Sequence, residues 1–355
     1  MTYRVVQWST GNVGRHALAG IDARPDLELV GVWVSSPAKV GVDAGELAGL
    51  GRTLGVAATD DAQALLGLAP DCIVHTAMAD HRLGEAIDDL CGFLRAGIDV
   101  VSSGPVFLQF PDGVMPPAMI DPVRQAAADG EASLWVNGVD PGFANDWLAL
   151  VVTGIAERIE QVRCMEILNY ATYDQAMVLF DIMGFGRPLD DTPLLLHPGV
   201  LTTAWGSVVQ QLARGLGITL EGITEHVERL PAPETFTVAS GTIGAGTMAA
   251  LRFEVRGMWQ GRPVIVLEHV TRLRDDLAPH WPQPTGSGCY RVEVTGEPNY
   301  TVDLQLVGTD GDHNTAGLKA TAMRLVNAIP AVVAAPPGLL TALDLPLVTG
   351  RGLVR

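Results

Sequence analysis

The residues whose types and spacing best suit a binding function form one short run near the start of the chain: Ser9, Thr10, Gly11, Asn12, Val13 and Gly14. The run follows an apolar stretch, Tyr3 to Trp8, that predicts a buried β-strand, and it precedes a helical pattern. Gly11 would let the backbone approach a pyrophosphate, and Gly14 would let the helix pack closely on the strand. Free N–H groups in the first helical turn would bind the phosphates. Because Ser9 replaces the first glycine of the G-x-G-x-x-G pattern, an ordinary tight turn is the alternative.

A second set of candidates follows the next expected strand, Leu27 to Val34. Ser35, Ser36 and Lys39 stand where an NAD-preferring domain usually places an acid on the ribose 2′-hydroxyl. Two hydroxyls and a lysine suit a 2′-phosphate better, and Arg15 can also reach it. The predicted cofactor is therefore NADP, with NAD less favoured. The alternative is that Lys39 simply faces solvent.

Small or polar residues also follow three further expected strands, at the ends where ligands bind in open parallel sheets. These candidates for contact with the cofactor are Thr76, Ala77, Ser102, Ser103 and Asn137. Asn137 would orient the nicotinamide amide or the substrate. As a polar group at a strand end, it alternatively bonds only to the backbone.

Hydride transfer needs a positioned substrate and a group that supplies or accepts a proton. The catalytic candidates are Asp140, Tyr173 and His197. Asp140 follows the expected sixth strand and can act as acid, base or ammonium ligand, or merely cap a turn. Tyr173, with Tyr170, ends a strand and can donate a proton, or only pack. His197 is isolated in a loop and can reach the cleft.

Other polar residues have structural interpretations of comparable weight. Asp174 is as well suited to cap the following helix as to contact a ligand. Glu268 and His269 are neighbours in an alternating strand, so they point to opposite faces and cannot both enter one site. One of them is expected on the solvent or dimer face. His313 and Asn314 would begin the last helix, with Asn314 as its cap, and the spacing of His, Asp and Glu predicts no metal site.

The first 143 residues alternate strands with helices, which predicts a Rossmann domain with a doubly wound parallel sheet. The expected strands are residues 3–8, 27–34, 55–58, 71–77, 98–102 and 133–138, and the later helices are residues 81–96 and 122–130.

The pattern changes after an expected helix at residues 144–156. Residues 144–310 predict an α+β substrate and dimerisation domain with a mostly antiparallel open sheet, and Gln260-Gly261 is expected to form a hairpin turn. The expected elements are strands at 160–169, 248–259, 263–274, 290–295 and 301–307 and a helix within 199–217. The tail, 311–355, contains a strong helix at 314–328, which is expected to return to the Rossmann domain.

Composition narrows the class of protein further. The chain has 355 residues and a formal net charge of −17, which disfavours nucleic acid and anionic membranes as partners. It has no apolar run long enough to span a bilayer and no signal-peptide pattern at its start. The four cysteines lack metal-ligand spacing and are expected to be reduced thiols. These features predict a cytoplasmic protein with a small-molecule substrate.

Three segments resemble a known family: VVQWSTGNVGRHAL, VNGVDPGFANDWL and TAMRLVNAIPAVVAAPPGLLTALDLP. They are similar to the dihydrodipicolinate-reductase-like oxidoreductases, and most to the branch of 2,4-diaminopentanoate dehydrogenase and the native amine dehydrogenases, in a mycobacterial-type form. The resemblance covers essentially the whole chain. It implies a Rossmann domain, a substrate domain that also forms a homodimer, and reversible oxidative deamination of an amine with NAD(P).

The chain departs from the family pattern in two places. It lacks the H-H-x-x-K pattern of dihydrodipicolinate reductases, so that reaction is not expected. The amine dehydrogenases have a glutamate in an S-T-x-E-E segment after the fifth strand, whereas this chain has Ser102-Ser103-Gly104-Pro105-Val106-Phe107 and no acid before Asp112. Three functions therefore stay open: an amine dehydrogenase acting on a small ketone or amine, a C=N, C=C or carbonyl reductase without ammonia, and a non-catalytic NADP sensor.

Overall fold

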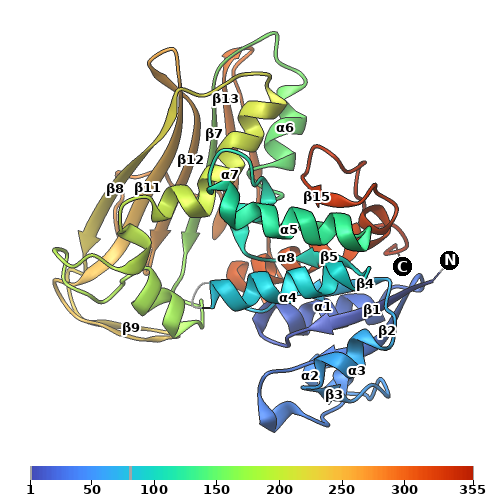
Figure 1. The fold of residues 1–355 in the computed structure, drawn as a ribbon. Coiled ribbons are helices and arrows are strands. Elements are labelled where there is room, and N and C mark those ends of the chain that lie inside the picture. Colours follow the sequence, from blue (N-terminus) through green and yellow to red (C-terminus); the bar gives the residue numbers. More distant parts are fainter. Residues whose placement is uncertain (1, 80–81, 355) are drawn as a thin grey trace. The chain divides into compact units, whose positions relative to one another are not determined.

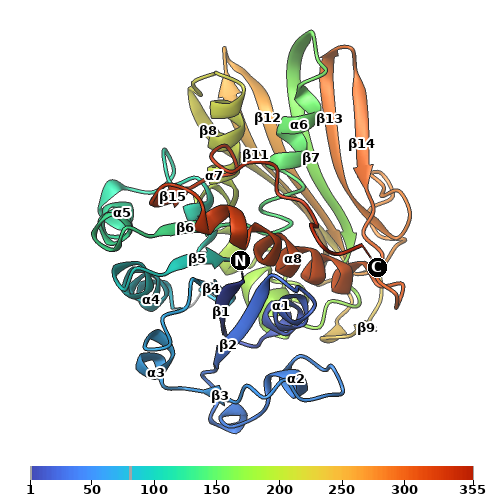
Figure 2. The same cartoon turned by 90° about the vertical axis from the view of Figure 1, so that its right-hand side faces the viewer.

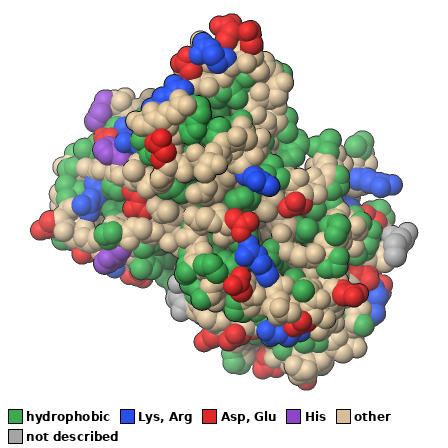
Figure 3. Space-filling model, turned by 45° about the horizontal axis from the view of Figure 1, so that its top comes forward, with side chains coloured by type: hydrophobic (Ala, Val, Ile, Leu, Met, Phe, Trp, Pro, Cys, Tyr) green, Lys and Arg blue, Asp and Glu red, His purple; other side chains and the backbone are tan. Residues whose placement is uncertain are grey.

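The computed structural model describes residues 2–79 and 82–354. The chain forms two compact units, one of residues 1–139 with 318–355 and the other of residues 140–317. No helix in the described ranges is long and apolar enough to cross a membrane. In the space-filling view of Figure 3, acidic and basic side chains are interspersed over the visible surface.

The first unit contains a seven-stranded sheet in which every neighbouring pair is parallel. The spatial order is β15-β6-β5-β4-β1-β2-β3, so the chain reverses its direction of winding between β1 and β4. The bounds are β1 (Tyr3–Trp8), β2 (Leu27–Trp33), β3 (Ala58–Thr59), β4 (Cys72–His75), β5 (Asp99–Ser102), β6 (Ser133–Val136) and β15 (Gly338–Leu340). The predicted doubly wound parallel sheet is confirmed.

Helices cover both faces of this sheet, because its strands carry apolar side chains on both faces. Val6 faces a core shared with α4 and α5, whereas Val5 faces a core shared with α1 and α8. Figures 1 and 2 show these two helical layers. The bounds are α1 (Asn12–Asp22), α2 (Ala44–Leu47), α3 (Ala62–Leu66), α4 (Leu83–Arg95), α5 (Pro117–Gly130) and α8 (His313–Val333). The last helix was expected to return to the Rossmann sheet. This is confirmed, because Ala322 and Leu325 of α8 lie in the same apolar core as Val5.

The second unit contains a six-stranded sheet in the order β14-β13-β7-β12-β11-β8, in which only the β7–β12 pair is parallel among the described strands. The predicted mostly antiparallel sheet is therefore confirmed. Its bounds are β7 (Arg158–Asn169), β8 (Gly222–Pro231), β11 (Met248–Trp259), β12 (Arg262–Arg272), β13 (Gly288–Glu297) and β14 (Tyr300–Leu304); β9 (Phe236–Val238) and β10 (Gly241–Ile243) form a separate hairpin.

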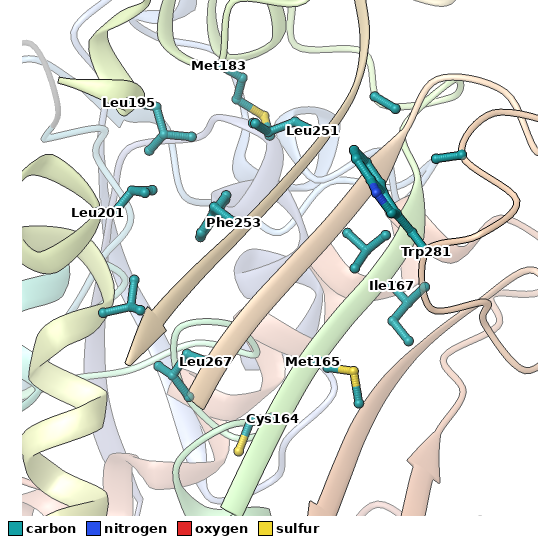
Figure 4. Close-up of a cluster of buried hydrophobic side chains, with 14 of the residues drawn as sticks. Cys164, Met165, Ile167, Met183, Leu195, Leu201, Leu251, Phe253, Leu267 and Trp281 are labelled. Carbon is teal, nitrogen blue, oxygen red and sulfur yellow. The ribbon is translucent and has the colours of Figure 1, made fainter. Parts of the chain in front are cut away.

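One face of the six-stranded sheet is covered by α7 (Val200–Gly215), and α6 (Trp147–Thr153) packs beside it. Figure 4 shows Leu201 of α7 in one apolar cluster with Phe253 of β11 and Leu267 of β12. At the β11–β12 hairpin, Gln260 and Gly261 have φ values of 51° and 71°. Two successive positive φ angles are typical of a type I′ turn, so the predicted hairpin turn is confirmed.

Several predicted element boundaries were wrong in physically instructive ways. The helix after Asp174 is a π-helix, Met177–Ile182, whose N-cap is Ala176, so Asp174 does not cap it. Asn314 lies inside α8, and the side chain of Asp312 accepts the N–H of Thr315 in the capping role instead.

The other differences concern where elements begin. Helix α5 starts at Pro117 and not at Pro122, because a proline is tolerated at a helix start. Strand β3 lies at Ala58–Thr59 and not at residues 55–58, since Gly55 has a φ of 76°. His81, expected to begin a helix, lies outside the described residues, and α4 begins at Leu83.

Candidate active site

The turn between β1 and α1 has free hydrogen-bond donors that suit an anion. Gly11 is the N-cap of α1, and among the described residues no side chain caps the first helical turn. That turn contains no acidic residue that would repel a phosphate. Its amide groups and the positive end of the helix dipole therefore favour a negatively charged group.

The glycines of this turn have two different steric roles. A Cβ at Gly14 would lie 2.2 Å from the carbonyl oxygen of Ser9, so only glycine permits this close packing. A Cβ at Gly11 would meet no heavy atom of the described residues within 4 Å, which leaves open space above the turn. Ser9 has a φ of 75° and so adopts the left-handed conformation that the first glycine of the pattern usually provides. These residues fit the pyrophosphate of a dinucleotide.

Buried hydrogen bonds fix the shape of the turn. Gln7, which is fully buried, donates from Nε2 to the carbonyl of Ser9 at 2.7 Å and to Oγ1 of Thr76 at 2.8 Å. Thr76 in turn donates to the carbonyl of Trp8 at 3.1 Å, so it braces the turn, and Ala77 beside it is buried. Sequence reasoning missed Gln7, whose signal was a polar side chain directly after the apolar pair Val5-Val6 and before Trp8.

Lys39 lies beside the same turn rather than simply facing solvent. Its Nζ donates to the carbonyl oxygen and to Oγ1 of Thr10, both at 3.1 Å. Ser35 is exposed and Ser36 is half-buried where the chain leaves β2. The structure thus places a cation next to the β1–α1 turn, and its predicted contact with a 2′-phosphate stays a prediction.

Two of the candidates at the ends of β5 and β6, Ser102 and Asn137, form hydrogen bonds with other side chains of the first unit. Ser102 is fully buried and its hydroxyl lies 2.8 Å from Nδ1 of His75, while Ser103 is half-buried. Asn137 accepts a hydrogen bond at 3.0 Å from Nε of Arg324, a residue of α8 that sequence reasoning missed. These contacts anchor the strand ends where a dinucleotide would lie.

In the second unit, strand register places four chemically distinct side chains in one row. Tyr290 on β13 pairs with Glu166 on β7, Glu166 pairs with His269 on β12, and His269 pairs with Phe253 on β11. Residues directly opposite on neighbouring strands share a face of the sheet. Asp140, which lies at the start of this unit and outside the strands, adds a second carboxylate beside His269.

His269 is buried between the two carboxylates, a group we call the His269 cluster (Asp140, Glu166 and His269). Its Nδ1 lies 3.4 Å from Oε1 of Glu166, and its Nε2 lies 3.3 Å from Oδ1 of Asp140. The ring stacks on Phe253 at 4.7 Å between centroids and meets the edge of Trp205 at 4.6 Å. The imidazole is thus fixed in position between two acids.

Neighbouring donors fix the two carboxylates as well. Tyr170 donates its hydroxyl to Oε1 of Glu166 at 2.6 Å. Oδ1 of Asp140 accepts from Nδ2 of Asn145 at 2.7 Å and from Nε1 of Trp205 at 3.0 Å. Tyr170 and Trp205 are only half-buried, so each contacts the buried cluster and also exposes part of its surface.

The opposite charges in the His269 cluster favour the ionised forms of both His269 and Glu166. Burial alone would lower the pKa of His269, but the carboxylates of Asp140 and Glu166 outweigh it and raise this pKa to about 10. Burial would raise the pKa of Glu166, but His269 and the Tyr170 hydroxyl outweigh it and lower this pKa. Near neutral pH the cluster therefore holds an imidazolium beside carboxylate, a proton store of the kind used in acid–base catalysis.

The raised pKa of His269 predicts a loss of stability in mild alkali. The protonated form contributes fully below the unfolded-state pKa of 6.5, and its contribution is lost as pH rises through about 10. The loss should be of the order of a few kcal/mol. We expect the thermal midpoint of the wild type to fall more steeply between pH 7 and 10 than that of His269→Gln. Parallel slopes for the two proteins would contradict the assignment.

The structure separates the sequence-predicted catalytic candidates. Asp140 belongs to the His269 cluster, and Tyr173 lies against Tyr170, with 4.8 Å between ring centroids, and accepts from Gln175. His197 is exposed ahead of α7. Glu268 lies on the opposite face from His269, as predicted, where it pairs with Arg163 and Arg252.

Glu166 is the functional candidate that sequence reasoning missed, although it is the one acid within the apolar stretch Cys164-Met165-Glu166-Ile167-Leu168. Within residues 2–79 and 82–354, no group of three His, Cys, Asp or Glu side chains is arranged to hold a metal ion.

A doubly wound sheet with a turn open to pyrophosphate, together with a second unit that carries a proton store, is typical of dinucleotide-dependent oxidoreductases. Comparison with known proteins identifies the family. The chain belongs to the amine dehydrogenase family: it is 44% identical over 346 residues to an amine dehydrogenase of Streptomyces virginiae, which covers 96% of each chain.

Two further comparisons agree with this family. The model of the 2,4-diaminopentanoate dehydrogenase C-terminal domain matches residues 143–352. The 2,4-diaminopentanoate dehydrogenase of Acetoanaerobium sticklandii is 23% identical over 328 residues, which cover 87% of this chain and 88% of the relative. The predicted resemblance to this branch is confirmed.

Solved structures show the same fold. The amine dehydrogenase from Mycobacterium smegmatis matches with a TM-score of 0.80 and 24% identity, covering 99% of this chain and 98% of the other. GenD2 from gentamicin A biosynthesis, solved in complex with NAD, matches with a TM-score of 0.53 and 14% identity, covering 92% and 86%. The protein is an NAD(P)-dependent oxidoreductase of the amine dehydrogenase type.

Proposed function

We propose that this protein catalyses the reversible reductive amination of a small ketone with NADPH, and that the His269 cluster handles the protons. The observation that carries the proposal is the buried imidazole of His269 within 3.4 Å of Glu166 and 3.3 Å of Asp140. These two acids supply the carboxylates that the segment after β5 lacks. The named activity of the Streptomyces virginiae relative supports the same reaction class.

The proton balance of amination suits this cluster. A ketone, an ammonium ion and a hydride give one amine and one water, and the bound nicotinamide supplies the hydride. Ammonium must lose a proton before its nitrogen attacks the carbonyl carbon, and the hydroxyl that forms must gain a proton before it leaves as water. A carboxylate of the cluster accepts the first proton and the imidazolium of His269 donates the second. Glu166, in contact with His269, then returns its proton to the imidazole.

The carboxylates also have an electrostatic role. Loss of water leaves an iminium cation, which a nearby carboxylate stabilises before the hydride reaches it. Tyr170, Asn145 and Trp205 hold Glu166 and Asp140 in fixed directions, so little reorganisation is needed when the positive charge forms. The same groups act in reverse when the amine is oxidised.

The direct test is NADPH oxidation by the pure protein with a panel of small ketones, with and without ammonium. Ammonium-dependent oxidation that yields the amine supports the proposal. Oxidation at the same rate without ammonium would instead identify a reductase of a C=O, C=N or C=C bond, an alternative favoured by the missing acid after β5. Tight NADPH binding with no turnover over the panel would favour a sensor of the cofactor.

The preference for NADP rests on Lys39, which lies against Thr10 at the start of the phosphate-binding turn. We expect Lys39→Ala and Ser35→Asp each to raise the KM for NADPH by about tenfold or more. The KM for NADH should stay within about twofold, because only NADPH has a 2′-phosphate. The measurement is the ratio of KM values for the two cofactors. Lys319→Ala, with the same loss of charge in α8, is the control, and equal losses for both cofactors would remove Lys39 from the 2′-phosphate site.

We further propose a cytoplasmic homodimer that pairs through the face of the six-stranded sheet opposite α7. That face carries the buried acids Glu254 and Glu268, held by Arg163 and Arg252. A buried charge network on a sheet face that no described helix covers is suited to a polar interface. Sedimentation analysis should give about twice the chain mass of 37.5 kDa; a monomer at micromolar concentration would contradict the proposal.

A further inference from the structure

The His269 cluster is buried, so protons need a path to it from solvent. Glu166 and His269 are 4% and 5% exposed. Amination of a ketone by ammonium and a hydride gives a neutral amine and water, and an amine that leaves in its charged form has taken up one further proton. Substrate and nicotinamide exclude water from the side on which they react. Each turnover therefore calls for a second path by which a proton reaches the cluster.

Tyr290, a buried residue of β13, is the first group on such a path. It pairs with Glu166 across the sheet, and its hydroxyl donates a hydrogen bond to the Glu166 carboxylate. Burial and the nearby charge of Glu166 raise the pKa of Tyr290 well above its usual range, so the hydroxyl keeps its proton. A Cβ at Gly317 would lie 3.3 Å from the hydroxyl oxygen, which places this oxygen beside the start of α8.

His313, the first residue of α8, is the next group. It stands four residues before Gly317 and so on the same side of the helix, and its ring lies 5.6 Å from that of Tyr290 between centroids. Neither ring nitrogen forms a hydrogen bond of good geometry to a described residue, although the carbonyl of Leu306 interacts with the ring. Burial lowers the pKa of His313, so the ring is neutral near pH 7. A neutral imidazole accepts a proton at one nitrogen and releases one from the other.

A pocket of about 410 Å³ connects His313 with solvent. Liquid water occupies about 30 Å³ per molecule, so the pocket can hold several waters. Its walls include exposed residues as well as the buried histidine, namely Thr172, Ser287 and Gly311. Water in the pocket can therefore exchange protons with the bulk and with the ring of His313.

The charged groups around His313 favour the uptake of a proton. Glu166 and Asp312 both act to raise the pKa of His313 against the effect of burial. Asp275 and Arg272 also line the pocket, and they interact with each other. The negative charges near the ring stabilise the imidazolium while the proton passes.

We propose that His313 and Tyr290 carry protons between this pocket and Glu166, and so restore the proton that His269 gives up in each turnover. The inference rests on the proposed function. A hydronium ion in the pocket protonates one nitrogen of His313 and becomes water. The other nitrogen passes its proton to the hydroxyl of Tyr290, directly or through one water, as that hydroxyl gives its own proton to Glu166. Glu166 then protonates the imidazole of His269, and amine oxidation reverses these transfers.

His313 and Tyr290 act through Glu166, so their loss should slow repeated turnover more than the first one. The test uses weak buffer and the ketone that gives the fastest NADPH oxidation. His313→Phe and Tyr290→Phe should each lower steady-state kcat about tenfold and leave the first turnover within about twofold, because the cluster already holds the proton for it. His197→Phe, a matched change at an exposed histidine, should alter neither rate.

Added imidazole distinguishes proton transfer from a structural role. His313→Ala should be as slow as His313→Phe, but it leaves space for a small base where the ring was. Imidazole in the buffer should therefore restore most of the steady-state rate of His313→Ala and leave that of His313→Phe unchanged.

Proton exchange is also measurable without turnover, on NADP⁺-bound protein with ¹⁵N-labelled histidines. The Nδ1 proton of His269 faces Glu166 and its Nε2 proton faces Asp140. His313→Phe should slow exchange of the Nδ1 proton with solvent about tenfold or more and that of the Nε2 proton less than about twofold. This result supports the path even if the protein aminates no ketone, so failure of the proposed function and failure of the path are told apart.

Three results would overturn the proposal. The first is a folded His313→Phe protein that exchanges the Nδ1 proton of His269 at the wild-type rate. The second is a first turnover that falls as far as the steady state, with no response of His313→Ala to imidazole. The third is slow exchange in Tyr170→Phe alone, because the path would then run through the half-buried Tyr170.

Discussion

His269→Gln is expected to lower kcat for amination about 100- to 1,000-fold while NADPH still binds normally. The substitution removes the proton that the imidazolium donates to the departing hydroxyl, and general acid catalysis of this kind contributes about 10²- to 10⁴-fold. Glutamine keeps a polar side chain between Asp140 and Glu166, so the cluster retains hydrogen-bonding capacity. Single-turnover measurements with saturating NADPH separate this chemical step from cofactor binding.

The matched control for this prediction is His197→Gln, since His197 is exposed ahead of α7. It should stay within about twofold of wild type. Glu166→Gln should reproduce most of the loss, because it removes the proton acceptor beside His269. Full activity in a folded His269→Gln protein would assign the proton transfer to another group, such as Tyr173.

The second large effect is expected for Gly14→Ala. The added Cβ would lie 2.2 Å from the backbone carbonyl of Ser9 and 2.7 Å from Oγ1 of Thr76, and a backbone atom cannot move aside as a flexible side chain can. We expect the free energy of unfolding to fall by roughly 2–4 kcal/mol and dinucleotide binding to become undetectable, because the strand–turn–helix geometry is disrupted. Denaturant unfolding and cofactor titration measure the two effects.

Gly11→Ala separates binding from stability at the same turn. Its Cβ would meet no described heavy atom within 4 Å, and Gly11 has a φ of −74°, which alanine adopts without strain. Stability should therefore change by less than about 0.5 kcal/mol. NADPH affinity should nevertheless fall tenfold or more, because the methyl group enters the space above the turn. Unchanged affinity in Gly11→Ala would show that the pyrophosphate does not lie there.

Much of the fold could be predicted from local patterns. Apolar strands alternating with amphipathic helices predicted the parallel sheet, and Gln260-Gly261 predicted the β11–β12 hairpin. Strand β8 was missed because its apolar residues, Ile223, Val227 and Leu230, do not alternate regularly with polar ones, and none of its residues is fully buried, as suits an edge strand. The short strand β15 was missed because three residues after a Pro-Pro-Gly sequence carry almost no periodic signal.

The candidate site was less accessible to sequence reasoning. Asp140 could be predicted because it follows a parallel strand, at the end where ligands bind. The pairing of Glu166 with His269 depends on the register of β7 against β12, two strands separated in the chain by α7 and four other strands. No spacing in the sequence encodes such contacts, because they arise only when the sheet is assembled.

The discontinuous first unit has a consequence for synthesis of the protein on the ribosome. Its sheet needs β15, and its second apolar core needs the α8 residues from Leu318 onward, so both wait until the chain has been made through Leu340. The unit of residues 140–317 is continuous and can fold as soon as it emerges. Until then, the apolar face that includes Val5, Ala17 and Trp135 lacks the α8 residues that cover it. A ribosome that stops before α8 is complete would therefore leave a nascent chain with a folded second unit and an unfinished nucleotide site.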